Sequence, residues 1–165
     1  MSYDKFIQNR TIAKQQIVDA SLDSAKFPSY ILSSFIDFET DGYLVGIQYM
    51  CAHASISGTA GSIDTYYPAG SIVAKVSADG LTITEGGNVT NFSGAQILLS
   101  HLSLPSNDGT SGLEADSRQT TIAYDADSKR IPIKSNDKLG VYLCANGLDS
   151  QINFCYTLTA YFVRS

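Results

Sequence analysis

The stretch that decides the fold runs Ile131-Pro132-Ile133, Ser135-Asn136-Asp137-Lys138, Leu139-Gly140-Val141-Tyr142-Leu143-Cys144-Ala145 and then Gln151-Ile152-Asn153-Phe154-Cys155-Tyr156-Thr157-Leu158-Thr159-Ala160-Tyr161-Phe162-Val163. In the last segment the apolar residues fall at every second position, from Ile152 to Phe162. A period of two indicates a strand with one face on a core. The run before it offers a matching apolar face, and Asn146-Gly147 suits a connection that needs positive φ. The sequence therefore predicts a long C-terminal antiparallel hairpin.

Alternation and turn signals predict further strands upstream. Residues 29–39 and 43–54 are expected to form a second hairpin around Asp41-Gly42, a strong tight-turn pair. Residues 71–76 and 81–84 are expected to form a third, and residues 120–124 and 129–134 two short strands. Residues 96–104 suit either a strand or one turn of helix. The predicted core-facing sets are Leu32, Ile36 and Phe38 in one strand and Tyr43, Val45, Ile47, Tyr49 and Cys51 in the next.

A count of about eight strands, with almost no helical periodicity after residue 26, predicts an all-β fold with two packed antiparallel sheets. Eight strands favour a jelly roll, while an immunoglobulin-like or other Greek-key sandwich stays open. Residues 1–26 differ from the rest and form a predicted N-terminal arm, with residues 27–165 as the β-sandwich domain. Within the arm, residues 12–22 suit an amphipathic helix, and an extended arm with a short strand suits the sequence equally. Such an arm either crosses onto a neighbouring subunit, or is disordered or packed on its own domain.

Composition and charge narrow the function classes. Of the 165 residues, 44% are apolar and only 16% charged, below the roughly 25% usual for globular domains, and the net charge is −5. No basic stripe is visible, so direct binding to nucleic acid is not expected. No stretch approaches the roughly 18 apolar residues of a membrane span, and residues 1–10 lack the apolar segment of a signal peptide.

The three cysteines, Cys51, Cys144 and Cys155, lie on strand-like segments. A disulfide between Cys144 and Cys155 is geometrically possible across the predicted last hairpin. Reduced, buried cysteines are the favoured interpretation in a chain without a signal peptide. No CxxC spacing or Cys/His cluster is present, so neither a metal nor a cofactor is expected.

The sequence contains no recognisable catalytic motif. Nucleophilic catalysis needs a base beside the nucleophile, and the only histidines, His53 and His101, are expected to pack as structural residues. Acidic loops such as residues 106–109 and 125–128 are typical of turns more than of Ca²⁺ sites. The sequence therefore predicts a protein that is not an enzyme and has no catalytic residues.

Apolar and aromatic residues outside the predicted core are the candidate contact residues. Phe6, Ile7 and Ile12 in the arm are predicted to contact a neighbouring subunit. Tyr66 and Tyr67 lie in a loop bounded by Gly and Pro and are predicted to bind at the surface, because tyrosine is enriched in interfaces and stacks on sugar rings.

Three pieces carry a family resemblance: Ser135-Asn136-Asp137-Lys138-Leu139, Val141-Tyr142-Leu143 and Tyr156-Thr157-Leu158-Thr159-Ala160-Tyr161-Phe162. They resemble the closing part of small virion jelly rolls and of trimeric tumour-necrosis-factor/C1q-like sandwiches. The arm, the low charge and the Ser/Thr/Gly-rich loops also resemble bacteriophage head decoration, cement and minor capsid proteins.

This resemblance implies a virion structural protein, a capsid, decoration or cement subunit that acts by self-assembly and by binding a shell lattice. The implied partners are copies of itself, as a trimer or pentamer, and other capsid proteins. The implied location is the virion, assembled in the host cytoplasm. A receptor- or carbohydrate-binding module of a fibre or adhesin, using Tyr66 and Tyr67, is the alternative hypothesis.

Overall fold

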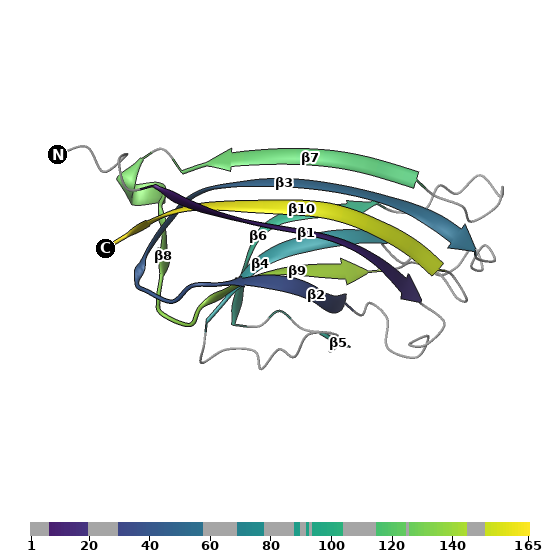
Figure 1. Cartoon of the computed structure of the whole chain (residues 1–165), viewed down its shortest axis with the longest axis horizontal. Coiled ribbons are helices and arrows are strands. Elements are labelled where there is room, and N and C mark those ends of the chain that lie inside the picture. Colours follow the sequence, from purple (N-terminus) through teal and green to yellow (C-terminus); the bar gives the residue numbers. More distant parts are fainter. Residues whose placement is uncertain are drawn as a thin grey trace.

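The computed structural model describes residues 7–19, 30–57, 69–77, 88–89, 92, 94–103, 115–124, 126–144 and 151–165. This part of the chain consists of β-strands and a short 3-10 helix, without an α-helix (Figure 1). The elements are β1 (Gln8–Asp19), β2 (Tyr30–Asp37), β3 (Gly42–Ser57), β4 (Ala69–Val76), β5 (Asn88–Val89), β6 (Ala95–Ser103), β7 (Ala115–Ala123), η3 (Asp127–Lys129), β8 (Ile131–Ile133), β9 (Lys138–Cys144) and β10 (Gln151–Arg164).

The strands form two antiparallel sheets that pack face to face, which confirms the predicted β-sandwich (Figure 1). Sheet A has the order β1-β10-β3-β7, and β8 pairs with the start of β3. Sheet B has the order β5-β2-β9-β4-β6. Every pairing between these strands is antiparallel.

The pairing order is that of a jelly roll. With the short strands β5 and β8 set aside, the first strand pairs with the last (β1 with β10) and the second with the next to last (β2 with β9). The third then pairs with β7, and the innermost pair is β4 with β6. Successive pairs belong alternately to sheet A and sheet B. This nesting, in which two Greek keys wrap around one core, is the topology that the strand count favoured.

The core lies between the two sheets. Sheet A contributes the inward side of β10, where Ile152, Phe154, Leu158 and Ala160 have no exposed surface. Sheet B contributes the inward side of β9, where Leu139, Val141 and Leu143 are equally buried. The alternation in β10 therefore predicted its core-facing residues correctly, and the matching apolar face expected in the preceding segment is also buried.

The outer side of sheet B carries a second buried cluster. It is formed by Tyr30, Leu32, Ile72, Ala74, Val76, Tyr142 and Cys144. Phe92 covers part of it, with its ring edge-to-face against Tyr30 at 5.1 Å and against Tyr142 at 5.0 Å between centroids. Because β9 is buried on both faces, its sequence is an uninterrupted apolar run instead of an alternating one.

The predicted hairpins are wrong in their pairing. β9 and β10 lie in different sheets, since β9 pairs with β2 and β4 while β10 pairs with β1 and β3. β2 and β3 likewise lie in different sheets. A turn signal between two alternating segments marks a change of direction, but it does not say whether the chain returns beside itself or crosses to the facing sheet. For the third predicted hairpin, residues 81–84 lie outside the described residues, and β4 pairs with β6 and β9.

The separation of β9 and β10 also excludes the Cys144–Cys155 disulfide. Cys144 is buried in the outer cluster of sheet B, whereas Cys155 is exposed on the outer side of sheet A. None of the three cysteines forms a disulfide. The expectation of buried cysteines holds for Cys51 and Cys144 and is wrong for Cys155.

Two bulges break the predicted alternation. In β2 the register shifts between Leu32 and Ser34, so that Ser33 is the extra residue. Leu32 therefore faces the outer cluster, not the inner core that Ile36 and Phe38 enter. In β3 the register shifts at Val45, which buries Leu44 and leaves Tyr43 40% exposed. A bulge moves every residue on one side of it to the other face, which alternation alone does not reveal.

Two segments whose secondary structure the sequence left undecided are strands. Residues 96–104 coincide with β6, and the middle of the predicted arm is β1, paired with β10 of the same chain over its whole length. Of the two conformations predicted for the arm, residues 8–19 take the extended one. The boundary between an arm and a separate domain at residue 26 stays a prediction.

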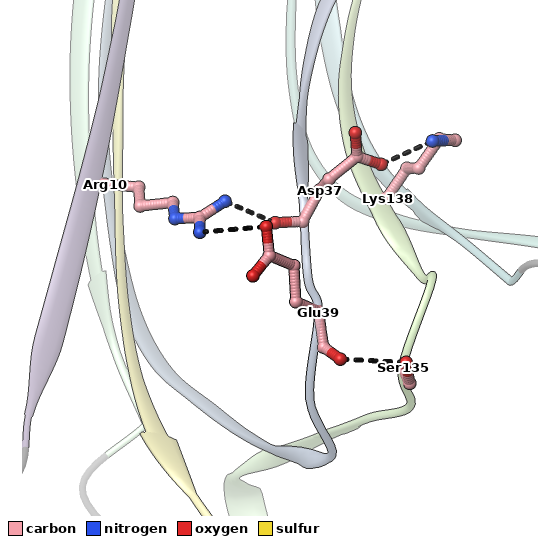
Figure 2. Close-up of polar contacts among 5 residues, drawn as sticks. All are labelled: Arg10, Asp37, Glu39, Ser135 and Lys138. Atoms are coloured by element: carbon pink, nitrogen blue, oxygen red, sulfur yellow. Dashed lines mark hydrogen bonds and ion pairs between the residues drawn. The ribbon is translucent and has the colours of Figure 1, made fainter.

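Two crossovers between the sheets are hydrogen-bonded to each other at one end of the sandwich (Figure 2). Residues 38–41 join β2 to β3, and residues 134–137 join β8 to β9. Phe38 N–H donates to the Asp137 carbonyl at 3.0 Å, and Asn136 N–H donates to the Phe38 carbonyl at 2.7 Å. Asn136 has a φ of 73°, which asparagine tolerates well. The polar turn 135–137 thus fixes where the chain changes sheets.

Side-chain hydrogen bonds link the sheets across the core. The Tyr49 hydroxyl on β3 donates to Ser71 Oγ on β4 at 2.6 Å. Tyr156 on β10 is hydrogen-bonded to Ser33 and Ser34, which the β2 bulge places side by side. His101 Nε2 on β6 bonds Thr120 Oγ1 on β7 at 2.6 Å. These pairs satisfy polar groups whose burial would otherwise cost stability.

We predict that Tyr49→Phe lowers the free energy of unfolding by about 1–3 kcal/mol, because Ser71 Oγ loses its buried donor. Ser71→Ala should cost a similar amount, and the double variant should cost less than the sum of the two. Chemical denaturation of the four proteins measures this coupling. Strict additivity would contradict a direct bond between the two hydroxyls.

We predict that the folded state loses stability between about pH 9 and pH 12. Burial raises the pKa of Cys144 from 9.0 to about 12 and that of Tyr142 from 10.0 to about 12. In this range the unfolded chain releases protons that the folded chain retains, so the free energy of unfolding falls as pH rises. Denaturation at stepped pH should show a shallower fall for Tyr142→Phe, with the exposed Tyr43→Phe as control. Equal slopes for both variants would overturn the prediction.

Candidate interaction surface

The outer face of sheet A carries no charged residue except Asp19, the last residue of β1, to which Gln151 Nε2 donates a hydrogen bond at 3.3 Å at the end of the sheet. Its outward positions follow from the unbroken parts of the register between β1, β10, β3 and β7. We call these residues the sheet A face. They are Asn9, Thr11, Ala13, Gln15 and Ile17 of β1; Asn153, Cys155, Thr157, Thr159 and Tyr161 of β10; Gly46, Gln48, Met50, Ala52 and Ala54 of β3; and Ser117, Gln119, Thr121 and Ala123 of β7.

The two positively charged residues of the edge strand β1, Arg10 and Lys14, alternate with the outward-facing residues and so belong to the inward-facing set. Arg10 and Lys14 stand opposite the inward-facing Ala160 and Tyr156. Their side chains reach past the edge of sheet A to β2, where Arg10 Nη1 donates to the Asp37 carbonyl at 2.7 Å and Lys14 Nζ to the Ser33 carbonyl at 2.6 Å. These contacts close one side of the sandwich and keep positive charge off the sheet A face.

At the opposite edge of sheet A the charged residue Arg118 likewise alternates with the outward-facing residues. Arg118 of β7 pairs with the buried Cys51, so it belongs to the inward-facing set, whereas Gln119 pairs with the outward-facing Met50. The strand order and register, and not the overall scarcity of charge alone, therefore make the face uncharged.

The exposed side chains of the sheet A face are small polar groups with a few larger apolar ones. Thr11 and Thr159 are hydrogen-bonded through their hydroxyls at 2.8 Å, and Gln15 Nε2 donates to Asn153 Oδ1 at 3.2 Å. Ile17 is 56% exposed and Met50 48% exposed. With strands about 4.8 Å apart and about 3.4 Å per residue, the face covers about 600 Å² in projection, which approaches the ~800 Å² per partner of a standard protein interface.

A small polar pocket lies at the end of the sandwich where the crossovers meet (Figure 2). Arg10 lies beside Asp37 and Glu39, with 3.9 Å between Arg10 Nη2 and Glu39 Oε1. Lys138 pairs with the Asp37 carboxylate, and Ser135 Oγ donates to the Glu39 carbonyl. The pocket volume of about 20 Å³ holds roughly one water molecule. This pocket is too small for a substrate, and its groups bind one another.

The two histidines pack as the sequence suggested. His101 bonds Thr120, and its ring lies 5.2 Å from that of Tyr49. The ring of His53 lies 5.5 Å from that of Phe154. Within the described ranges, no three His, Cys, Asp or Glu side chains come together as metal ligands. That part of the chain also has no helix long and apolar enough to cross a membrane.

The predicted contact residues are placed only in part. Ile7, just before β1, is 43% exposed, and Ile12 is half-buried, packed against the core. Phe6, Tyr66 and Tyr67 lie outside the described residues, so the contact roles and the carbohydrate-binding alternative stay predictions. The sequence reasoning missed the sheet A face. Its signal was the uncharged outward set of the last strand, which was visible as Asn153, Cys155, Thr157, Thr159 and Tyr161.

Comparison with known proteins leaves the family of this chain open. No protein-family model matches it, and no curated protein is significantly similar in sequence. Among solved structures, a CocE/NonD family hydrolase from Staphylococcus aureus superposes with a TM-score of 0.39 and 11% sequence identity over 93% of this chain. The match spans 34% of that protein, so this chain corresponds to about a third of its length.

Proposed function

We propose that this chain is a structural, non-enzymatic protein of a virion, a capsid, decoration or cement subunit that self-assembles and binds a shell lattice. The single observation that carries the proposal is the uncharged sheet A face. Jelly rolls of this size are common in viral capsids, which adds support from the fold. The sheet A face is the surface through which copies of the chain associate.

Charge makes a second copy the best occupant of this face. Each chain carries a net charge of −5, so two copies repel each other where their charges approach. At the sheet A face no charged group has to lose water, and the cores of protein interfaces are depleted in charge for this reason. The repulsion and the desolvation cost are therefore both lowest there.

The two sheets differ in a way that fits this role. The outer side of sheet B is partly covered by Phe92, and its apolar cluster is buried within the chain itself, although Ile97 of β6 is 49% exposed. The outer side of sheet A exposes Met50, Ile17 and Cys155. In the described part of the molecule, exposed outward residues therefore extend over four strands of sheet A, whereas much of the outer side of sheet B is already buried.

We predict that Met50→Lys weakens self-association by about tenfold or more, because a charge must then be desolvated or repelled at the centre of the interface. Sedimentation of the purified chain over a range of concentrations measures the native mass. Gln96→Lys, which adds the same charge on β6 of sheet B, is the matched control and should leave the mass unchanged. A wild-type chain that stays monomeric throughout would refute the proposed function.

We predict that association protects Cys155 from thiol reagents. In the dissociated chain Cys155 should react rapidly at neutral pH, whereas the buried Cys51 and Cys144 should react only after unfolding. The rate of maleimide labelling should therefore fall as protein concentration rises, and Met50→Lys should restore the fast rate. Labelling that does not depend on concentration in an associating sample would place the interface elsewhere.

A further inference from the structure

The edges of the two sheets are protected to very different degrees. An edge strand presents unpaired N–H and C=O groups, and proteins usually blunt it with charge, proline, a bulge, short length or a covering segment. β5 is two residues long, and β6 contains a bulge at Leu98. β1 is closed against β2 by Arg10 and Lys14. β7 is the remaining edge of the described sheets.

β7 lacks most of these protective features. It spans Ala115–Ala123, pairs with β3 without any register shift, and contains no proline. No strand of the described part of the chain pairs with its other edge, and it is the uppermost strand of sheet A in Figure 1. A long, regular edge of this kind is a template for a further strand.

We propose that β7 pairs antiparallel with β7 of a second copy, with the two-fold axis at Gln119, and so joins two copies of sheet A into one continuous sheet. This register is the one that pairs all nine residues of the strand. It places Gln119 opposite its own copy and Ser117 opposite Thr121. Serine–threonine and glutamine–glutamine pairs of this kind hydrogen-bond across strands.

The charges of β7 favour its own copy as the partner. The strand has two charged residues of opposite sign, Asp116 and Arg118. In the register about Gln119, Asp116 falls opposite Ile122 and Arg118 opposite Thr120, so no like charges face each other. The joined sheets also continue the uncharged outer surface across the two-fold axis, since Ser117, Gln119 and Thr121 all belong to the sheet A face.

This edge contact goes beyond the proposed function and is carried by a different observation. A copy bound to the sheet A face stacks on top of the sheet, whereas a copy bound to the β7 edge extends the sheet in its own plane. A subunit with both surfaces has two distinct contacts with its copies, which is what an extended lattice needs.

Disulfide trapping tests the register. In a Cys155→Ser background, Gln119→Cys places two thiols directly opposite each other, at the Cα separation of about 4.5–5.5 Å found for facing residues and suited to a disulfide. Thr121→Cys, on the same strand and face, is the matched control, because its two copies lie about 13 Å apart in this register. Mild oxidation followed by non-reducing electrophoresis measures the rate of covalent dimer formation.

We expect Gln119→Cys to form the dimer on the order of 10²-fold faster than Thr121→Cys, because proximity raises the effective thiol concentration. Equal rates, or no dimer, would overturn the register and the proposal. Hydrogen exchange gives a second readout: β7 amides should lose protection when the sample is diluted. The two surfaces are tested separately by adding Met50→Lys to the Gln119→Cys variant. If the larger assembly is lost but trapping stays rapid, the β7 edges pair independently of the sheet A face. If instead the wild-type native mass never exceeds that of a monomer and trapping stays slow, both proposals fail.

Discussion

The rest of the structure depends on the packing of β10 against sheet B. Phe154, Tyr156 and Leu158 are almost wholly buried between the sheets, and β10 is flanked by β1 on one side and β3 on the other. Because side chains of a strand alternate, burying this apolar set forces the intervening residues outward. The same strand therefore determines both the core and the middle of the outer surface. Any change that loosens its inward side also disturbs the surface on which association is proposed.

The sequence was informative about faces and uninformative about partners. The inward residues of β10 were predicted because alternation is a local pattern, and those of β9 because its segment is continuously apolar. The pairing of β9 with β2, and of β10 with β1, joins segments more than a hundred residues apart, and no local pattern encodes it. The pair Asp41-Gly42 was predicted to close a hairpin, yet residues 38–41 take the chain across to the other sheet, as do residues 134–137. Their hydrogen bonds to each other, through Phe38 and Asn136, explain why short turns suffice for these crossovers.

The candidate surface needed the structure for a related reason. Its outward residues come from four strands, and β1, β3 and β7 each looked unremarkable alone. The sheet A face lacks charge because the register places Arg10, Lys14 and Arg118 in the inward-facing set of their strands. The bulges at Ser33 and Val45 add a second obstacle, because they reverse the faces of β2 and β3 partway along. The packing of the two histidines was easier to predict. Neither belongs to a catalytic motif in the sequence, and in the structure His53 packs against Phe154 and His101 against Tyr49.

Charged residues are concentrated at one end of the sandwich. Asp37, Glu39, Lys134 and Lys138 gather at the end where the chain crosses between the sheets, and their interactions with neighbouring groups tie the crossovers down. The apolar cluster on the outer side of sheet B is buried within the chain, with Ile97 exposed beside it, whereas outward residues of sheet A are exposed along four strands. A contact through that surface alone is satisfied once a small closed oligomer has formed. The proposed pairing through the edge of β7 would add a contact in a second direction. The combination of the two distinguishes a subunit that can extend a lattice from one that merely forms an isolated oligomer.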